Sequence, residues 1–298
     1  MFKDLAQKIK ATDIVGKFIY INVIVYIFVL LIGVFSVLFN TGETCDYIMR
    51  YFELPASLPL LLKQPWTIIT YMFLHEHFMH ILWNMIALYF FGRIFLNFYS
   101  VRHFVGVYII GGILGGITFL LSYNIFPYFA SHIDYSFLIG ASASVLAIVV
   151  ASAVRSPEYR IRLLLFGNIK LSTFAIVTVG ISFLMLSGNN AGGNFAHIGG
   201  AFAGWLMAYL LNKGKDITEF VNRPIDWFVT IFKKNDKRKK KKGNFTYSPG
   251  GRATDYEYNA RKKASEAEID KILEKIKSGG YSSLTEEEKK KLFEASSN

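Results

Sequence analysis

The stretch Gly140-Ala141-Ser142-Ala143-Ser144-Val145-Leu146-Ala147-Ile148-Val149-Val150-Ala151 begins with small and polar residues and continues as an uncharged apolar run. This composition is typical of a helix inside a membrane. Hydrocarbon contains no water to satisfy polar side chains, so such groups are costly there and usually face the interior of a helix bundle. Ser142, at the start of the run, is therefore a candidate functional residue.

The whole chain has the composition of a membrane protein. Of its 298 residues, 52% are hydrophobic, and these are concentrated in long uncharged blocks. Stretches long enough to cross about 30 Å of hydrocarbon occur at about 19 to 39, 66 to 92, 103 to 123, 138 to 154, 171 to 187 and 194 to 212. The sequence therefore predicts an all-α membrane protein with six transmembrane helices and a cytoplasmic C-terminal tail.

The distribution of lysine and arginine predicts the orientation, because cationic residues in short loops stay on the cytoplasmic side. One side has only Arg50 and Lys63, whereas the other has the N-terminal lysines, Arg93, Arg102, Arg155, Arg160, Arg162, Lys170 and the lysine-rich tail. Both termini are therefore expected in the cytoplasm. The first apolar stretch lacks an A-x-A-like cleavage site and more spans follow it, so we interpret it as a retained helix. The lack of an Arg/Ser-rich, acid-poor presequence favours a bacterial cytoplasmic (inner) membrane.

Composition changes along the chain predict four regions. They are a cytoplasmic N-terminal segment at 1–18, the six-helix membrane domain at 19–212, an interfacial, polybasic and linker segment at 213–254, and a short helical cytoplasmic tail at 255–298. Within the tail, Thr285 and Glu288 have the spacing of a capping box, and an amphipathic helix is expected around residues 269–276.

The net charge of +11 belongs largely to the loops and the tail. The segment from Lys233 to Lys242 has eight cations and one acid, which fits either a solvated spacer or a contact with anionic lipids. Nucleic-acid binding has no other support in the sequence. Cys45 is the single cysteine, so an intrachain disulfide is excluded.

Three of the predicted spans place polar groups at a similar depth. The second, fourth and sixth spans all begin on the outer side, and a helix rises 1.5 Å per residue. Ser142 and His197 are then expected roughly 5 to 10 Å below the outer surface, and His80 at about 11 Å. Asn84 follows His80 by one helical turn, with His75 farther toward the outer end. These side chains are expected to converge.

The converging side chains have the chemistry of nucleophilic catalysis. A serine nucleophile needs a base to take its proton and donors to stabilise the developing oxyanion. His197 fits the first task, while His80, Asn84 and the Ser142 backbone amide fit the second. No Asp or Glu occurs in the later spans to orient His197, so a dyad is expected in place of a triad.

Small residues favour close packing of the fourth and sixth spans. Gly200 and Gly204 form a G-x-x-x-G pair, and the fourth span offers Ala143, Ala147 and Ala151.

Taken singly, Ser142 would more often be a packing residue and His197 an interfacial histidine. A zinc site is not expected, because His75-Glu76-His77 lacks the spacing of paired ligands on one helix face.

Three segments together resemble the rhomboid family of intramembrane serine proteases. They are His75-Glu76-His77-Phe78-Met79-His80-Ile81-Leu82-Trp83-Asn84, Gly140-Ala141-Ser142-Ala143, and Ala196-His197-Ile198-Gly199-Gly200-Ala201-Phe202-Ala203-Gly204. They resemble the family's H-x4-H-x3-N, G-x-S-x and A-H-x-x-G elements, in the same order.

The resemblance covers roughly residues 15 to 212 and implies a six-helix rhomboid-type bundle. It implies Ser142 as nucleophile, His197 as general base and later acid, His80 and Asn84 in the oxyanion hole, and His75 as a supporting residue. The implied reaction is hydrolysis of a peptide bond in or near a transmembrane segment of a membrane-protein substrate. No metal, nucleotide or organic cofactor is implied.

Two other interpretations remain open on the sequence. A catalytically inactive rhomboid-like protein would bind transmembrane clients without cutting them, although the intact Ser142 and His197 argue against it. A six-span transporter would be expected to carry ionisable residues near the midplane or broken helices in two matched halves. The polar groups of this chain gather toward the outer surface instead.

Overall fold

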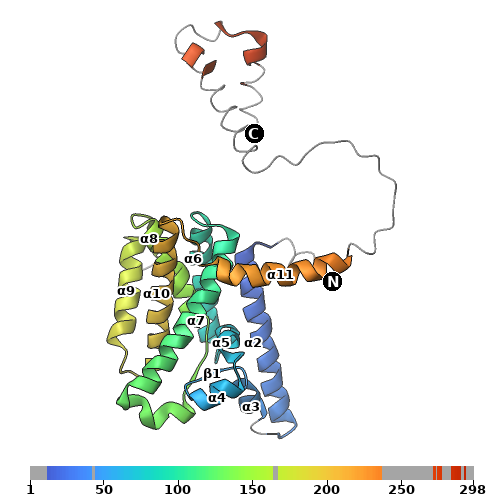
Figure 1. Cartoon of the computed structure of the whole chain (residues 1–298), viewed down its shortest axis with the longest axis vertical. Coiled ribbons are helices and arrows are strands. Elements are labelled where there is room, and N and C mark those ends of the chain that lie inside the picture. The colour runs from blue at the N-terminus through green and yellow to red at the C-terminus, as the bar shows by residue number, and fades with distance from the viewer. Residues whose placement is uncertain are drawn as a thin grey trace. The chain divides into compact units, whose positions relative to one another are not determined.

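The computed structural model is mostly helical (Figure 1). It describes residues 12–41, 44–163, 167–236, 271–272, 274–276, 283–289 and 292. Each predicted span contains one long helix, and these are α2 (Ile14–Leu38), α6 (Phe78–Leu96), α7 (Val101–Ile125), α8 (Ser142–Arg155), α9 (Leu171–Leu184) and α10 (Ala191–Asn212). Among the described residues, α2, α6 and α7 are long and apolar enough to cross a membrane, and α8 and α9 are shorter apolar helices.

The second predicted span is not one continuous helix, so that part of the prediction was wrong. The chain forms α5 (Thr67–Thr70) and a 3-10 turn (Tyr71–Phe73), extends at Leu74, and begins α6 only at Phe78. The side chain of His77 caps α6 by accepting a hydrogen bond from the His80 backbone amide at 3.0 Å. His75 therefore precedes the helix, whereas His80 and Asn84 lie on it one turn apart.

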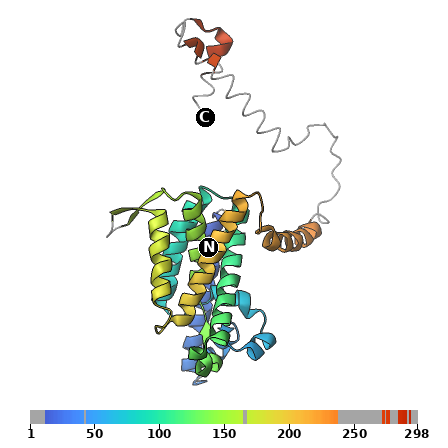
Figure 2. The same ribbon diagram turned by 60° about the vertical axis from the view of Figure 1, so that its left-hand side comes forward.

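Helix α8 is enclosed by its neighbours. It contacts α6, α7, α9 and α10, and every residue from 143 to 153 is buried. A helix that is apolar all round fits this central position. Figure 2 shows the helices of the bundle running side by side.

Glycines bring α7 and α10 against α8. A Cβ on Gly200 would lie 2.2 Å from the carbonyl oxygen of Ala143, and one on Gly204 would lie 2.1 Å from that of Ala147. On α7, a Cβ on Gly115 would lie 2.6 Å from the Ala143 side chain. Real side chains do not fit these distances, so the three helix backbones approach one another only because glycine is present.

The end of the bundle nearest the α8 N-terminus carries short elements. They are α3 (Thr44–Arg50), α4 (Leu58–Lys63), the 3-10 segment Pro127–Tyr135, and strands β1 (Leu54–Pro55) and β2 (Phe137–Leu138). The two strands are antiparallel, with Leu54 opposite Leu138 and Pro55 opposite Phe137. This pairing holds the segment that leads into Ser142 against the first loop.

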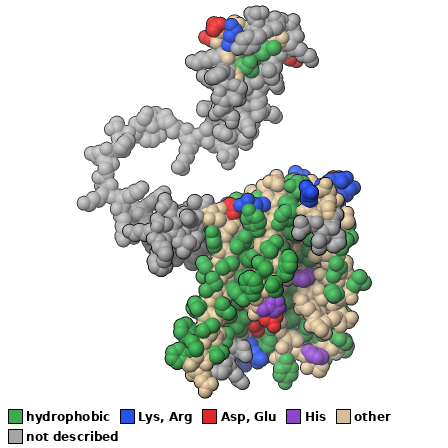
Figure 3. All heavy atoms as spheres, turned by 180° about the vertical axis from the view of Figure 1, so that it is seen from behind, with side chains coloured by type: hydrophobic (Ala, Val, Ile, Leu, Met, Phe, Trp, Pro, Cys, Tyr) green, Lys and Arg blue, Asp and Glu red, His purple; other side chains and the backbone are tan. Residues whose placement is uncertain are grey.

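The opposite end of the bundle carries α11 (Glu219–Asp236) and the antiparallel hairpin of β3 (Arg160–Leu163) and β4 (Gly167–Lys170). Figure 1 shows α11 lying across the bundle, close to the start of α2. Arg102 of α7 pairs with Asp226 at 2.6 Å, and the Asn222 side chain donates to the Arg102 carbonyl at 3.1 Å. Figure 3 shows a largely apolar flank, with most of the visible basic side chains at one end.

The segment just before α11 contains the carboxylate of Asp216, which has several polar partners. Asp216 accepts hydrogen bonds from the backbone and hydroxyl of Thr218, at 2.8 and 2.6 Å, and lies 3.2 Å from Nε2 of His103. Partial burial raises the pKa of the Asp216 carboxyl, but the hydrogen bonds from Thr218 and the nearby His103 lower it more, so the pKa lies below its usual value. The ionised form is favoured in the fold.

Residues 238–298 form a separate unit. The predicted capping box is confirmed, because the Thr285 amide donates to Glu288 at 2.7 Å and the Glu288 amide donates to the Thr285 hydroxyl at 3.3 Å. The predicted helix around 269–276 is described only at 271–272 and 274–276, where the backbone is helical. Of the segment from Lys233 to Lys242, residues 237–242 lie outside the described residues, as do 1–11 at the N-terminus.

Candidate active site

Ser142 and His197 form a hydrogen bond between helices α8 and α10. The Ser142 hydroxyl oxygen lies 2.8 Å from Nε2 of His197, although 55 residues separate the two in sequence. The structure thus brings together the serine and the histidine that the sequence singled out. Ser142 is the first residue of α8. Helix α10 begins at Ala191, so His197 is its seventh residue.

The N-terminus of α8 presents unpaired backbone donors beside Ser142. The first four amides of an α-helix have no acceptor within the helix, and Ala141 at the N-cap supplies no side-chain cap. The helix dipole adds partial positive charge at the same place. These amides can stabilise a negative charge that develops next to the Ser142 hydroxyl.

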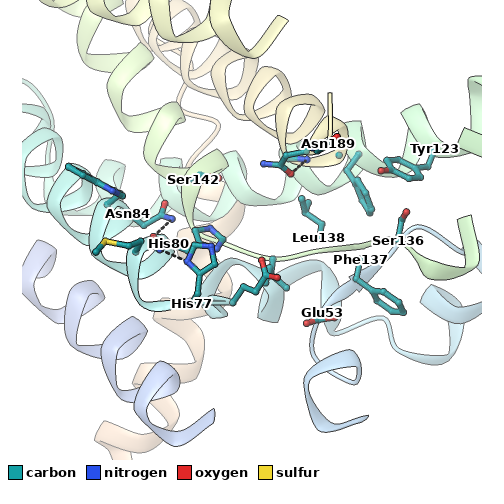
Figure 4. Close-up of a pocket in the computed structure, with 18 of the residues that line it drawn as sticks. Glu53, His77, His80, Asn84, Tyr123, Ser136, Phe137, Leu138, Ser142 and Asn189 are labelled. Atoms are coloured by element: carbon teal, nitrogen blue, oxygen red, sulfur yellow. Dashed lines mark hydrogen bonds between the residues drawn. The ribbon is translucent and has the colours of Figure 1, made fainter. Parts of the chain in front are cut away.

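His80 and Asn84 face Ser142 from α6. All three line one open cavity of about 810 Å³ (Figure 4). The Asn84 side chain is 7% exposed and donates one amide hydrogen to the His80 carbonyl at 2.9 Å, which leaves its second hydrogen available. Asn84 and the His80 ring can therefore both supply donors to the cavity.

Gly140 makes room for the His80 ring. Its φ is +116°, a conformation that side chains rarely adopt, and a Cβ there would lie 2.7 Å from Nε2 of His80. Its amide donates to the Tyr71 carbonyl at 3.0 Å, which ties the residues before Ser142 to the segment before α6. Glycine at this position thus permits both the turn into α8 and the approach of His80.

His75 packs against His80 but lines a different cavity from Ser142. It is 2% exposed, and its ring packs edge-on against His80 with the centroids 5.0 Å apart. Neither of its ring nitrogens has a hydrogen-bond partner within the described part of the chain. The described residues also contain no cluster of three or more His, Cys, Asp or Glu arranged to hold a metal ion.

One polar contact of the site was missed by the sequence reasoning. The Ser182 hydroxyl, on α9, lies 3.1 Å from Nδ1 of His197, on the opposite edge of the ring from Ser142. A search limited to Asp and Glu as partners of His197 could not find it. The sequence signal was a serine in the last turn of a helix that has no charged residue.

The cavity also has a wall of extended chain. Ser136, Phe137 and Leu138 run along it opposite α6 in Figure 4, and Glu53, Glu76 and Asn189 lie at other points of its lining. This wall continues through Gly140 into Ser142. An extended peptide placed along it would reach the Ser142 hydroxyl.

Comparison with known protein families identifies two parts of the chain. The Rhomboid domain matches residues 62–214, and a family of unknown function, DUF6576, matches residues 253–298. No curated protein matches the sequence. The first match spans 153 of the 298 residues, includes Ser142, His197, His80 and Asn84, and confirms the resemblance that those residues carried. The chain belongs to the rhomboid family.

Proposed function

We propose that this chain is an intramembrane serine protease that hydrolyses peptide bonds in or near the transmembrane segments of other membrane proteins. The observation that carries the proposal is the 2.8 Å contact between the Ser142 hydroxyl and Nε2 of His197. A hydroxyl is a weak nucleophile unless an adjacent base takes its proton, and this contact has the required geometry. No organic or metal cofactor enters the proposed reaction.

In the proposed mechanism, Nε2 of His197 takes the proton of the Ser142 hydroxyl as the oxygen attacks the scissile carbonyl carbon. The C–O bond forms and the carbonyl π electrons move to its oxygen. Donors from His80, Asn84 and the Ser142 amide stabilise that oxyanion. As the intermediate collapses, the C–N bond breaks and the imidazolium gives its proton to the leaving amine.

Water then completes the reaction by the same steps. His197 takes a proton from water, the resulting hydroxide attacks the acyl carbon, and the ester bond to Ser142 breaks as His197 returns the proton to the serine oxygen. The cavity beside Ser142 supplies room for water. Both half-reactions use Ser142, His80 and Asn84, which line this cavity, and His197, which contacts Ser142.

The test is labelling of the detergent-purified protein with a fluorophosphonate probe. We expect the parent to be labelled, and Ser142→Ala and His197→Ala each to abolish labelling. The matched control is Ser144→Ala, because this neighbouring buried hydroxyl lies against the Met72 sulfur at 4.0 Å and not against His197. If the folded parent and the control both remain unlabelled, the catalytically inactive, client-binding alternative replaces the protease.

We also propose that α2, α6, α7, α8, α9 and α10 cross a bacterial cytoplasmic membrane with both termini in the cytoplasm. The loop cations and the apolar helices support this topology. The single cysteine makes it testable, since Cys45 belongs to the predicted outer loop. We expect an impermeant maleimide to label Cys45 in intact cells, and to label Lys215→Cys in a Cys45→Ser background only after the membrane is opened.

The proposed domain organisation retains the four regions 1–18, 19–212, 213–254 and 255–298. The amphipathic α11 supports an interfacial position, because Phe220 and Trp227 are exposed there by 81% and 68%. We propose that anionic lipids bind the adjoining segment from Lys233 to Lys242. Replacing its cations with glutamine should weaken retention of the purified protein's anionic lipids, and unchanged retention would refute this contact.

A further inference from the structure

Ser182 occupies an unusual position on α9. It is 4% exposed, and its hydroxyl lies 3.1 Å from Nδ1 of His197 while Ser142 lies 2.8 Å from Nε2 of the same ring. The imidazole is thus held between two hydroxyl groups from two different helices. The roles of the two hydroxyls follow from where their protons go.

The hydroxyl hydrogen of Ser182 has an acceptor on its own helix. Its hydroxyl donates to the Thr178 carbonyl one turn earlier on α9, at 3.1 Å. A serine hydroxyl has one hydrogen and two acceptor lone pairs, so the Ser182 oxygen is left to accept from His197. A neutral imidazole carries a hydrogen on only one nitrogen, and when Ser182 donates to Thr178 its contact with His197 requires that hydrogen on Nδ1. Nε2 then keeps its lone pair and faces the Ser142 hydroxyl as an acceptor.

We propose that Ser182 is a positioning residue that holds His197 in the tautomer able to accept the Ser142 proton. The inference rests on the proposed protease function and extends it to α9. Ser182 gains and loses no proton. The imidazolium formed during catalysis still donates its Nδ1 hydrogen to the Ser182 oxygen, and the Ser182 hydroxyl still donates to the Thr178 carbonyl. Its effect is on which nitrogen of His197 is the base.

The proposal makes the docking of α9 a condition for catalysis. This helix is apolar and largely exposed, with Ile176 at 72% and Leu184 at 81%, and Ser182 is its one buried polar side chain. At its end, the Asn194 side chain of α10 donates to the Met185 carbonyl at 2.8 Å. When α9 is docked, both contacts form; when it leans away, His197 loses the acceptor of its Nδ1 hydrogen.

A purely structural role predicts a different result. Serines in apolar helices often bond to the carbonyl one turn earlier, and Ser182 does so. If that bond were its whole function, replacement by alanine would alter stability without altering the tautomer of His197. The experiment must therefore measure the tautomer of His197 directly, in addition to the activity.

The variants are Ser182→Ala, Ser182→Thr and the control Ser172→Ala in the full-length protein. Ser172 is on the same helix and its hydroxyl also bonds a carbonyl, that of Pro157 at 2.8 Å. We expect Ser182→Ala to lower kcat on a transmembrane peptide about tenfold, which corresponds to about 1.4 kcal/mol, with KM unchanged. The kcat of Ser182→Thr, which keeps a hydroxyl, should stay within about threefold of the parental value. The kcat of Ser172→Ala should equal that of the parent.

The direct readout is ¹⁵N NMR of histidine-labelled protein, with the His197 signals identified from a His197→Asn variant. We expect hydrogen on Nδ1 in the parent and in Ser182→Thr, and a mixture or a shift to Nε2 in Ser182→Ala. An unchanged tautomer in Ser182→Ala, or a parental kcat, would overturn the proposal. The NMR measurement needs no substrate, so it tests the role of Ser182 independently of protease activity. The protease function is tested separately, by fluorophosphonate labelling of the parent and of Ser142→Ala.

Discussion

Replacing Gly200 with alanine tests whether the contact between α8 and α10 sets the distance from Ser142 to His197. The added Cβ would lie 2.2 Å from the Ala143 carbonyl oxygen, and relief to 3.0 Å requires the two backbones to separate by about 0.8 Å. If Ser142 moved equally along its bond to His197, the distance would grow from 2.8 Å to about 3.6 Å. At that distance the hydrogen bond is lost.

We expect two measurable effects. Overpacking of a tight core costs about 1 to 3 kcal/mol, which should lower the unfolding temperature in detergent. A displacement of nearly 1 Å within a catalytic pair costs about a hundredfold in rate, which should appear in the rate of fluorophosphonate labelling. The loss of rate should be the larger effect.

The matched control is Gly180→Ala on α9. A Cβ on Gly180 meets nothing within 4 Å, so the same substitution should leave labelling unchanged and add up to about 1 kcal/mol of helix stability. If Gly200→Ala labels at the parental rate, the reasoning is refuted, because the glycine contact would then not govern the distance between nucleophile and base.

Three further predictions concern the surroundings of the site and the far end of the bundle. Gly140→Ala should slow labelling and lower the unfolding temperature, since its Cβ would press on His80; unchanged values in both assays would count against that contact. Asn84→Ala should reduce kcat about a hundredfold in proteoliposomes with little change in KM, and a parental kcat would remove Asn84 from the oxyanion site. The lowered pKa of Asp216 means that its stabilisation is present above about pH 4, the unfolded value, and lost as the pH falls below it. Hydrogen exchange in α11 should therefore accelerate on acidification, Asp216→Asn should remove this pH dependence, and the same acceleration in both proteins would contradict it.

Hydropathy predicted most of the bundle. The depth of the polar residues within the predicted spans pointed to Ser142 and His197. The six apolar stretches each contain a long helix, because a long apolar block has few other ways to satisfy its backbone. Ser142 and His197 stood out because polar groups are rare in such blocks. Gly200 and Gly204 were recognised because small residues four apart favour close helices.

The break before α6 could not be predicted from hydropathy. Apolar residues lie on both sides of it, so a sliding average runs through the turn. The N-cap is His77, which is not among the usual Ser, Thr, Asp and Asn caps, so the start of the helix gave no familiar signal. The position of His75 outside the helix followed from the same turn.

Ser182 was missed for a different physical reason. Its serine-to-carbonyl bond on α9 is a local feature common in apolar helices, and only the packing of α9 on α10 brings His197 to its other side. The glycines of α7 were also overlooked, although Gly111 and Gly115 have the same four-residue spacing as those on α10. Tertiary contacts decide which of several small or polar residues matter.

The burial of α8 gives the proposed nucleophile and the proposed base different protein surroundings. The helix that carries Ser142 is covered by four neighbours, so acyl chains do not reach residues 143–153. Helix α9, by contrast, presents its apolar side chains outward and touches the far edge of the His197 ring. We therefore expect a change in bilayer thickness or acyl-chain order to act first on α9 and its contact with His197, while Ser142 stays at the start of an enclosed helix. Lipid composition would tune this protein through proton acceptance and not through the placement of its nucleophile.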